Sequence, residues 1–252
     1  MEDLLQAFVN FGFYLKTYFS SLSTDFLNHK KRIFIGYLAI SMVMAIVFLC
    51  AWRGFGVRGA FSKVFDKKVF WSGSAKADYL IYAINRIISI IVSPYLIAQS
   101  AVTTFLFFQL SKQNAIGFLS FDHWPSILII TLYTLTYFFI DDLSKYIVHR
   151  CMHRWQFLWA FHKVHHSAET MTPITVYRVH PLESIIYGLR GSFVIGAVIG
   201  IFAYCFGINN FSLATLLGVN LFSFIFNVAG ANLRHSHIEI AYWPWLEKIL
   251  IS

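Results

Sequence analysis

The sequence predicts an all-α fold, a polytopic membrane helix bundle with a histidine-rich metal site at its cytoplasmic face. Hydrophobic residues make up 58% of the 252 residues and charged residues only 13%, whereas soluble domains contain about 25% charged residues. Several uncharged apolar runs are long enough to cross a bilayer as helices. Six of the ten histidines fall within residues 141–183, directly beside such runs.

Residues 1–28 predict an amphipathic helix, because apolar residues recur there at helical spacing: Leu4, Phe8, Phe11, Leu15, Phe19 and Leu22. We expect this helix to lie on the bilayer surface or to pack against the helix bundle. A cleaved signal peptide is not expected, since Glu2 and Asp3 stand where such a peptide carries positive charge.

Residues 33–52 form the first expected membrane span, because twenty uncharged residues match a hydrocarbon core about 30 Å thick. Residues 53–86 are expected to be an irregular loop, because four glycines interrupt this segment. The lysines and arginines of this loop place it in the cytoplasm and make anionic lipid headgroups its expected partner. They are Arg53, Arg58, Lys63, Lys67, Lys68, Lys76 and Arg86.

Four further spans are expected, at 87–110 with a kink at Pro94, at 127–140, at 184–206 and at 211–231. Gly196 and Gly200 stand four residues apart, which predicts a close helix–helix contact. The helix of 127–140 is expected to continue into the histidine-rich segment that follows. With this topology every group of histidines falls on the basic side of the membrane.

The histidines stand at two helical spacings. His149 and His153 are four residues apart, so a helix places both rings on one face. His162, His165 and His166 follow at i, i+3 and i+4, which predicts a second shared face. Imidazole favours transition metals, and five nitrogens exceed the four ligands of tetrahedral zinc. The spacing therefore predicts two metal ions, or one ion of higher coordination number.

Two carboxylates near the histidines are candidate catalytic residues. Asp142 precedes His149 by seven residues on the same helical face, where it could orient the imidazole. Plain interfacial polarity explains Asp142 equally well. Glu169 follows the second group of histidines as a polar residue near the cluster. Trp155 and Trp159 indicate that this region lies at the level of the lipid headgroups.

The segments HRCMH, LWAFHKVHHS and VYRVHPLE resemble the fatty acid hydroxylase superfamily, also called the sterol desaturase family, of membrane di-iron oxygenases. His149 and His153 match the first histidine box of that family. His162, His165 and His166 match its HxxHH box. The resemblance covers residues 125–252, and residues 1–124 carry no sign of it, so we expect an N-terminal helical region followed by a catalytic region.

The resemblance implies further site residues with weaker matches. His180 and Glu183 match an HP motif followed by Glu, with His180 as a ligand, a substrate contact or the start of a helix. In NLRHSHIEI, His235 is the better match to the third histidine region and His237 the weaker one. A final HxxHH box does not occur before Ser252, so we expect either that the catalytic region is incomplete at its C-terminal end or that the metal site is completed differently.

The resemblance implies a di-iron enzyme that hydroxylates or desaturates a lipid with O2, in a bacterial inner membrane or the endoplasmic reticulum. The chain has no flavin or nicotinamide motif, so a cytochrome b5-type or ferredoxin-type protein is the expected electron donor. Two alternatives are a membrane haem protein and a membrane metal-binding or transport protein without oxygenase activity. The net charge of +8 is accompanied by no nucleic-acid-binding motif, so nucleic acid is not an expected partner.

Overall fold

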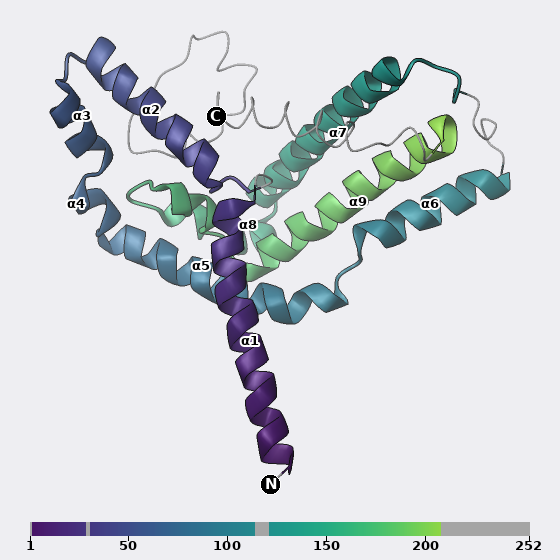
Figure 1. Cartoon of the computed structure of the whole chain (residues 1–252), viewed down its shortest axis with the longest axis horizontal. Coiled ribbons are helices and arrows are strands. Elements are labelled where there is room, and N and C mark those ends of the chain that lie inside the picture. The colour runs from purple at the N-terminus through teal and green to yellow at the C-terminus, as the bar shows by residue number, and fades with distance from the viewer. Residues whose placement is uncertain (1, 29–30, 114–120, 208–252) are drawn as a thin grey trace. The chain divides into compact units, whose positions relative to one another are not determined.

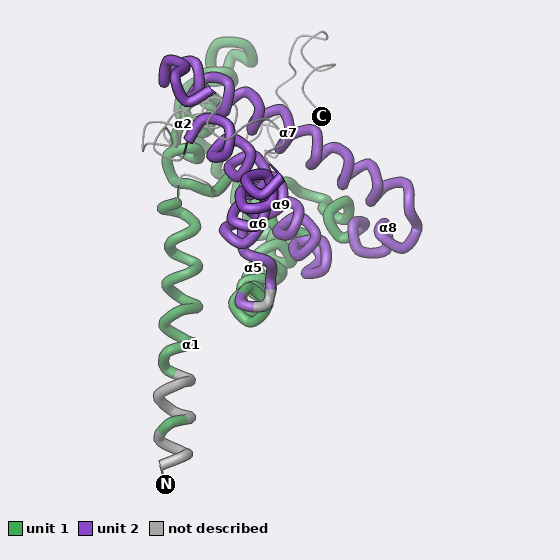
Figure 2. Tube along the Cα trace, turned by 90° about the vertical axis from the view of Figure 1, so that its right-hand side faces the viewer, with its two compact units in different colours: residues 1–93, 164–179, 224–252 green, residues 94–163, 180–223 purple. Residues whose placement is uncertain are grey.

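The computed structural model describes residues 2–28, 31–113 and 121–207, and the regular structure of these residues is helical throughout (Figure 1). The predicted all-α fold class is confirmed for this part of the chain. The chain divides into two compact units, which Figure 2 colours separately. Unit 1 comprises 1–93, 164–179 and 224–252, and unit 2 comprises 94–163 and 180–223. The division into 1–124 and 125–252 stays a prediction.

Unit 1 contains five α-helices and two short 3₁₀ turns among its described residues. These are α1 (Glu2–Leu27), α2 (Ile35–Ala51), α3 (Val57–Val64), α4 (Lys67–Phe70), α5 (Gly73–Val92), η2 (His165–Ser167) and η3 (Pro173–Tyr177). The helix predicted at residues 1–28 is therefore confirmed as α1. The first expected span, 33–52, is the 17-residue helix α2, which packs on α3 through Ala45, Leu49, Ala60 and Val64.

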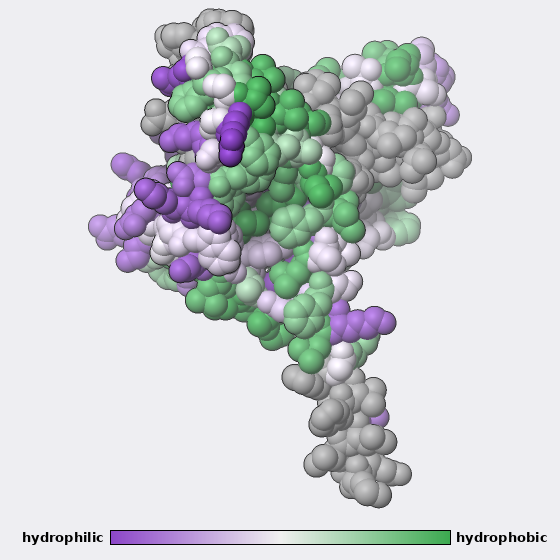
Figure 3. Space-filling model, turned by 60° about the vertical axis from the view of Figure 1, so that its left-hand side comes forward, coloured by the Kyte–Doolittle hydropathy of each residue, from purple (hydrophilic) through white to green (hydrophobic). Residues whose placement is uncertain are grey.

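The prediction of an irregular loop at residues 53–86 is wrong, because the segment folds into α3, α4 and most of α5. Two of these helices begin at side chains that cap them, although glycines interrupt the segment. The Asp66 carboxylate accepts a hydrogen bond from the Lys68 N–H at 2.8 Å and starts α4, and the Ser72 hydroxyl accepts one from the Ala75 N–H at 3.0 Å and starts α5. The basic side chains on α3 and α4 are exposed. Figure 3 shows hydrophilic and hydrophobic side chains next to one another on the surface.

A polar network joins α1 to α5 within unit 1. Arg86 forms an ion pair with buried Asp25 and donates a hydrogen bond to the Ser21 carbonyl oxygen at 3.0 Å. The Tyr82 hydroxyl donates to Asp25 at 3.1 Å, and the Tyr177 ring lies 5.3 Å from the Tyr82 ring, centroid to centroid. Burial and the nearby Asp25 charge raise the pKa of Tyr82, and the same two causes raise the pKa of Tyr177 to about 12.

Unit 2 is built from four helices, α6 (Gln99–Gln113), α7 (Ser126–Arg154), α8 (Gln156–His162) and α9 (Pro181–Phe206), among the residues described. The prediction of one kinked helix at 87–110 is wrong, although the interruption lies at Pro94 as expected. Helix α5 ends at Val92, the 3₁₀ turn η1 (Ser93–Tyr95) follows, and α6 begins at Gln99. Pro94 lies in this turn, and because proline lacks a backbone donor it cannot continue the hydrogen bonds of α5.

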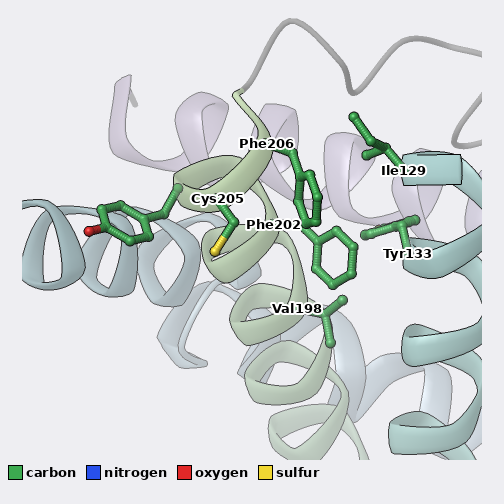
Figure 4. Close-up of a cluster of buried hydrophobic side chains, with 7 residues drawn as sticks. Ile129, Tyr133, Val198, Phe202, Cys205 and Phe206 are labelled. Atoms are coloured by element: carbon green, nitrogen blue, oxygen red, sulfur yellow. The ribbon is translucent and has the colours of Figure 1, made fainter. Parts of the chain in front are cut away.

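Helix α9 packs against both α6 and α7 (Figure 1). Its contact with α6 is close, since a Cβ atom at Gly196 would come within 2.7 Å of the Val102 Cβ and one at Gly200 within 2.9 Å of the Thr103 carbonyl oxygen. The close contact predicted for these two glycines is therefore observed. On the α7 side, Ile129 and Tyr133 face Val198, Phe202 and Phe206 (Figure 4).

Two described helices are long and apolar enough to cross a membrane, α7 with 29 residues and α9 with 26. The predicted continuation of the 127–140 helix into the histidine-rich segment is confirmed, because α7 runs without a break to Arg154. The expected span at 184–206 lies within α9. The expected span at 211–231 falls outside the described residues.

Candidate metal centre

The C-terminal end of α7 carries the first pair of candidate ligands. His149 and His153 lie one turn apart with their Nε2 atoms 3.1 Å from each other and their ring centroids 4.6 Å apart. The sequence places both rings here because a four-residue spacing is slightly more than one turn of helix. Both nitrogens can therefore serve as ligands of one ion.

His162 joins this pair from α8. After Trp155, whose extended backbone separates the two helices, α8 runs from Gln156 to His162 and packs against α7. The His162 ring centroid lies 4.8 Å from that of His149 and 4.9 Å from that of His153, and the residue is only 1% exposed. The three histidines each offer a ring nitrogen, and these nitrogens lie within 4.8 Å of one another.

Glu183, in the first turn of α9, holds the His162 ring. Its Oε1 atom lies 2.9 Å from His162 Nδ1, and Glu183 is 3% exposed. A carboxylate that accepts from Nδ1–H favours the neutral tautomer in which the lone pair of Nε2 can bind a metal. The sequence analysis named Glu183 only as the glutamate that follows the HP motif, and it predicted no role for Glu183 at the metal site. The only sequence feature that pointed to Glu183 was its position three residues after His180.

His180 begins helix α9. Its Nδ1 atom accepts a hydrogen bond from the Leu182 N–H at 3.2 Å, Pro181 occupies the first helical position, and the Phe161 ring lies 4.7 Å from the imidazole. This is the helix-start role that the sequence left open. His180 lies outside the group of candidate ligands, so a metal-binding role for it stays a prediction.

The predicted single helical face for His162, His165 and His166 is wrong. Helix α8 ends at His162, and the next two histidines lie in the 3₁₀ turn η2. A 3₁₀ turn has three residues per turn instead of 3.6, so the i, i+3, i+4 spacing no longer describes one face. His165 and His166 belong to unit 1, so their roles as ligands of the site in unit 2 stay predictions.

The two predicted catalytic carboxylates have different surroundings. Asp142 lies on α7 beside Asp141, and it is Asp141 that binds Arg190 of α9 at 2.8 Å and Lys145 at 2.5 Å. Glu169 lies in unit 1, is exposed, and donates its backbone N–H to the Ser74 hydroxyl at 3.1 Å. The catalytic roles of Asp142 and Glu169 stay predictions. His235 and His237 lie outside the described residues.

The arrangement fits a metal ion with nitrogen ligands. Two histidine nitrogens that each lie about 2.1 Å from one ion are separated by roughly 3 Å, which agrees with the 3.1 Å between the Nε2 atoms of His149 and His153. Imidazole nitrogens suit iron, copper, nickel or zinc. The described residues of unit 2 thus supply three ligands, enough to hold one ion with open positions.

Comparison with known proteins finds a matching family model and similar proteins. Residues 134–251 match the family model described as fatty acid hydroxylase. Two proteins of Dictyostelium discoideum, each named "Putative methylsterol monooxygenase", are 36% and 34% identical over 109 residues. These residues make up 43% of this chain and span only 38% and 37% of the two relatives. No solved structure matches the chain.

Proposed function

Residues 134–251 belong to the fatty acid hydroxylase family, and from this premise we propose that the protein is a membrane-bound di-iron oxygenase that hydroxylates or desaturates a lipid. The observation that carries the proposal is the convergence of His149, His153 and His162, with Glu183 hydrogen-bonded to His162. Buried imidazole fixed by a carboxylate is the arrangement that metal sites use to orient their ligands.

The ligand set of the proposal is larger than the trio in unit 2. The family resemblance adds the later histidines as further ligands of two iron ions: His165, His166, His180, His235 and His237. When bound, the iron would supply the oxidising power to break an unactivated C–H bond, which amino-acid side chains alone lack.

The chain's own residues would prepare the site for that chemistry. Glu183 would keep the proton of His162 on Nδ1, so that Nε2 could bind the metal. The Arg190–Asp141 ion pair ties α9 to α7 two turns before His149 and so supports the helix that carries His149 and His153. The apolar surfaces of α7 and α9 would admit a lipid from the bilayer, where a hydrophobic substrate dissolves.

The names of the relatives suggest the first substrate class to test. Both are named as methylsterol monooxygenases, so we propose a sterol methyl group as the site of oxidation. The electrons would come from a separate cytochrome b5-type or ferredoxin-type protein. Fatty acyl chains are the second class to test, because the family model is described as fatty acid hydroxylase.

The test is a reconstitution with defined components. The purified protein in lipid bilayers, loaded with Fe²⁺ and supplied with O2 and a reduced electron carrier, should convert a methylsterol or a fatty acid to an oxygenated or desaturated product. His162→Ala should lose metal and product together. The matched control is His123→Ala, because His123 is exposed and lies outside the candidate ligand group. Metal bound without any lipid oxidation would favour the alternative, a metal-binding membrane protein.

A further inference from the structure

Asp78 is a buried carboxylate on α5 that the proposed chemistry does not use. It is 0% exposed, and both of its oxygens accept hydrogen bonds. Thr175 Oγ1 donates to Oδ2 at 2.6 Å, and Arg178 Nη1 donates to Oδ1 at 2.9 Å. A charge so deeply buried is stable only with such partners, so the contact between Asp78 and Arg178 requires that the 164–179 segment stay on α5.

Arg178 reaches beyond Asp78 to the histidine turn η2. Its Nε donates to the Ser167 hydroxyl at 3.1 Å, and its Nη2 donates to the Ser167 carbonyl oxygen at 3.2 Å. Ser167 is the last residue of η2, which begins with His165 and His166. One guanidinium group thus binds the buried carboxylate of α5 and the end of the histidine turn at once.

Ser74 completes the attachment from the start of α5. Its carbonyl oxygen and its hydroxyl accept from Arg178 Nη1 at 3.2 and 3.1 Å, and the hydroxyl also accepts the Glu169 backbone N–H at 3.1 Å. The planar fork of arginine allows these contacts to be made together, whereas the single ammonium group of lysine cannot make them all.

We propose that Arg178, held by Asp78 and Ser74, is a positioning residue that fixes the turn η2 and so the direction of His166, which the family resemblance gives as a metal ligand. The inference rests on the metal site of the proposed function. It does not depend on the lipid substrate or on oxygen chemistry.

The test compares two arginine-to-lysine variants of the full-length protein. Arg178→Lys keeps a positive charge beside Asp78 and loses the forked contact with Ser167. Arg86→Lys is the matched control, because Arg86 also binds a buried aspartate and a serine carbonyl oxygen in unit 1, and these partners, Asp25 and Ser21, belong to α1 and not to η2. For each protein, Co²⁺ affinity is measured from its visible absorption bands and stability from thermal unfolding.

Arg178→Lys should bind Co²⁺ at least about 10-fold more weakly than the wild type and give altered absorption bands, as expected when a ligand is released. Arg86→Lys should keep the wild-type Co²⁺ affinity and absorption bands, and its unfolding temperature should be similar to that of Arg178→Lys. Ser167→Ala, which removes only the hydroxyl acceptor, should give a smaller loss of affinity. Equal Co²⁺ affinities for the wild type and Arg178→Lys would overturn the inference, as would equal losses in both lysine variants.

The same measurements separate this inference from the proposed function. A wild-type protein that binds Co²⁺ and Fe²⁺ but oxidises no lipid would refute the oxygenase, while the affinities of the variants would still decide the role of Arg178. A wild-type protein that binds neither metal would refute both.

Discussion

His162 Nδ1 and Glu183 Oε1 lie 2.9 Å apart, 1% and 3% exposed, and join the last residue of α8 to the first turn of α9. A carboxylate is costly to bury, so this contact requires a partner that can donate a proton or carry positive charge. The pair therefore fixes both the direction of the His162 ring and the approach of α9 to the candidate metal site.

Replacing Glu183 by Gln should weaken metal binding by about 10–100-fold, the usual effect of losing a carboxylate that orients a ligating imidazole. The glutamine keeps the shape of the side chain and removes its charge, so the fold should persist. Titration with Co²⁺ measures the affinity. Asp122→Asn is the control, because Asp122 is an exposed acidic residue of the same unit. An unchanged affinity in Glu183→Gln would show that the pair serves the fold alone.

Replacing either His149 or His153 by Ala should abolish stoichiometric iron binding, because each removal leaves too few of the three nitrogens in unit 2 to hold an ion firmly. Cys151→Ser is the matched control on the same helix turn, since Cys151 stands two residues from both histidines and so on another face. Iron per protein chain, measured by elemental analysis, checks the result. If Cys151→Ser also lost its iron, the sulfur would have to be included in the site.

Gly196→Ala should destabilise the protein by about 1–3 kcal/mol, because the new Cβ atom would approach the Val102 Cβ to 2.7 Å and the Gln99 carbonyl oxygen to 2.8 Å. Gly188→Ala in the same helix is the control. A Cβ atom at Gly188 would meet no atom of another segment within 4 Å, so the better helix propensity of alanine should stabilise α9 by up to about 1 kcal/mol. Unfolding in denaturant would measure both effects, and two changes of the same sign would contradict the packing argument.

The sequence predicted the parts of the site that depend on a single helix. A four-residue spacing was enough to bring His149 and His153 together, because α7 is regular to its end. The same reasoning gave a wrong prediction for His162, His165 and His166. Helix α8 ends at His162, and the other two histidines lie in a 3₁₀ turn with a different number of residues per turn. Periodicity describes positions within one helix, and it carries no information on where that helix stops.

Contacts between distant segments lay beyond the sequence pattern. The Glu183–His162 contact joins residues 21 positions apart, and the Arg178–Asp78 contact joins residues 100 apart. The helices in the basic segment were missed for another reason. The glycines there indicated a loop, but single capping residues such as Asp66 and Ser72 stabilise the starts of helices in this segment. By contrast, Gly196 and Gly200 were predictable as contact residues, although the sequence did not identify α6 as their partner.

The stability of the protein should fall as the pH rises from about 10 to about 12, in part because of Tyr177. Burial, and to a smaller extent the Asp25 charge, raises the pKa of Tyr177 from 10.0 to about 12 in the folded protein. In this range the unfolded chain loses the phenolic proton while the folded protein retains it, so rising pH favours unfolding. The contribution of Tyr177 is thus fully present below pH 10 and is lost as the pH approaches 12.

Tyr177→Phe keeps the ring contact with Tyr82 and removes the titrating group, so it should flatten the decline by at most about 1.4 kcal/mol per pH unit. Denaturant unfolding, followed by helical circular dichroism at several pH values, measures the slope. Tyr14→Phe is the control, because Tyr14 is 60% exposed on α1, and its slope should match that of the wild type. A Tyr177→Phe protein whose stability falls as steeply as that of the wild type would show that the phenol is not buried in this way.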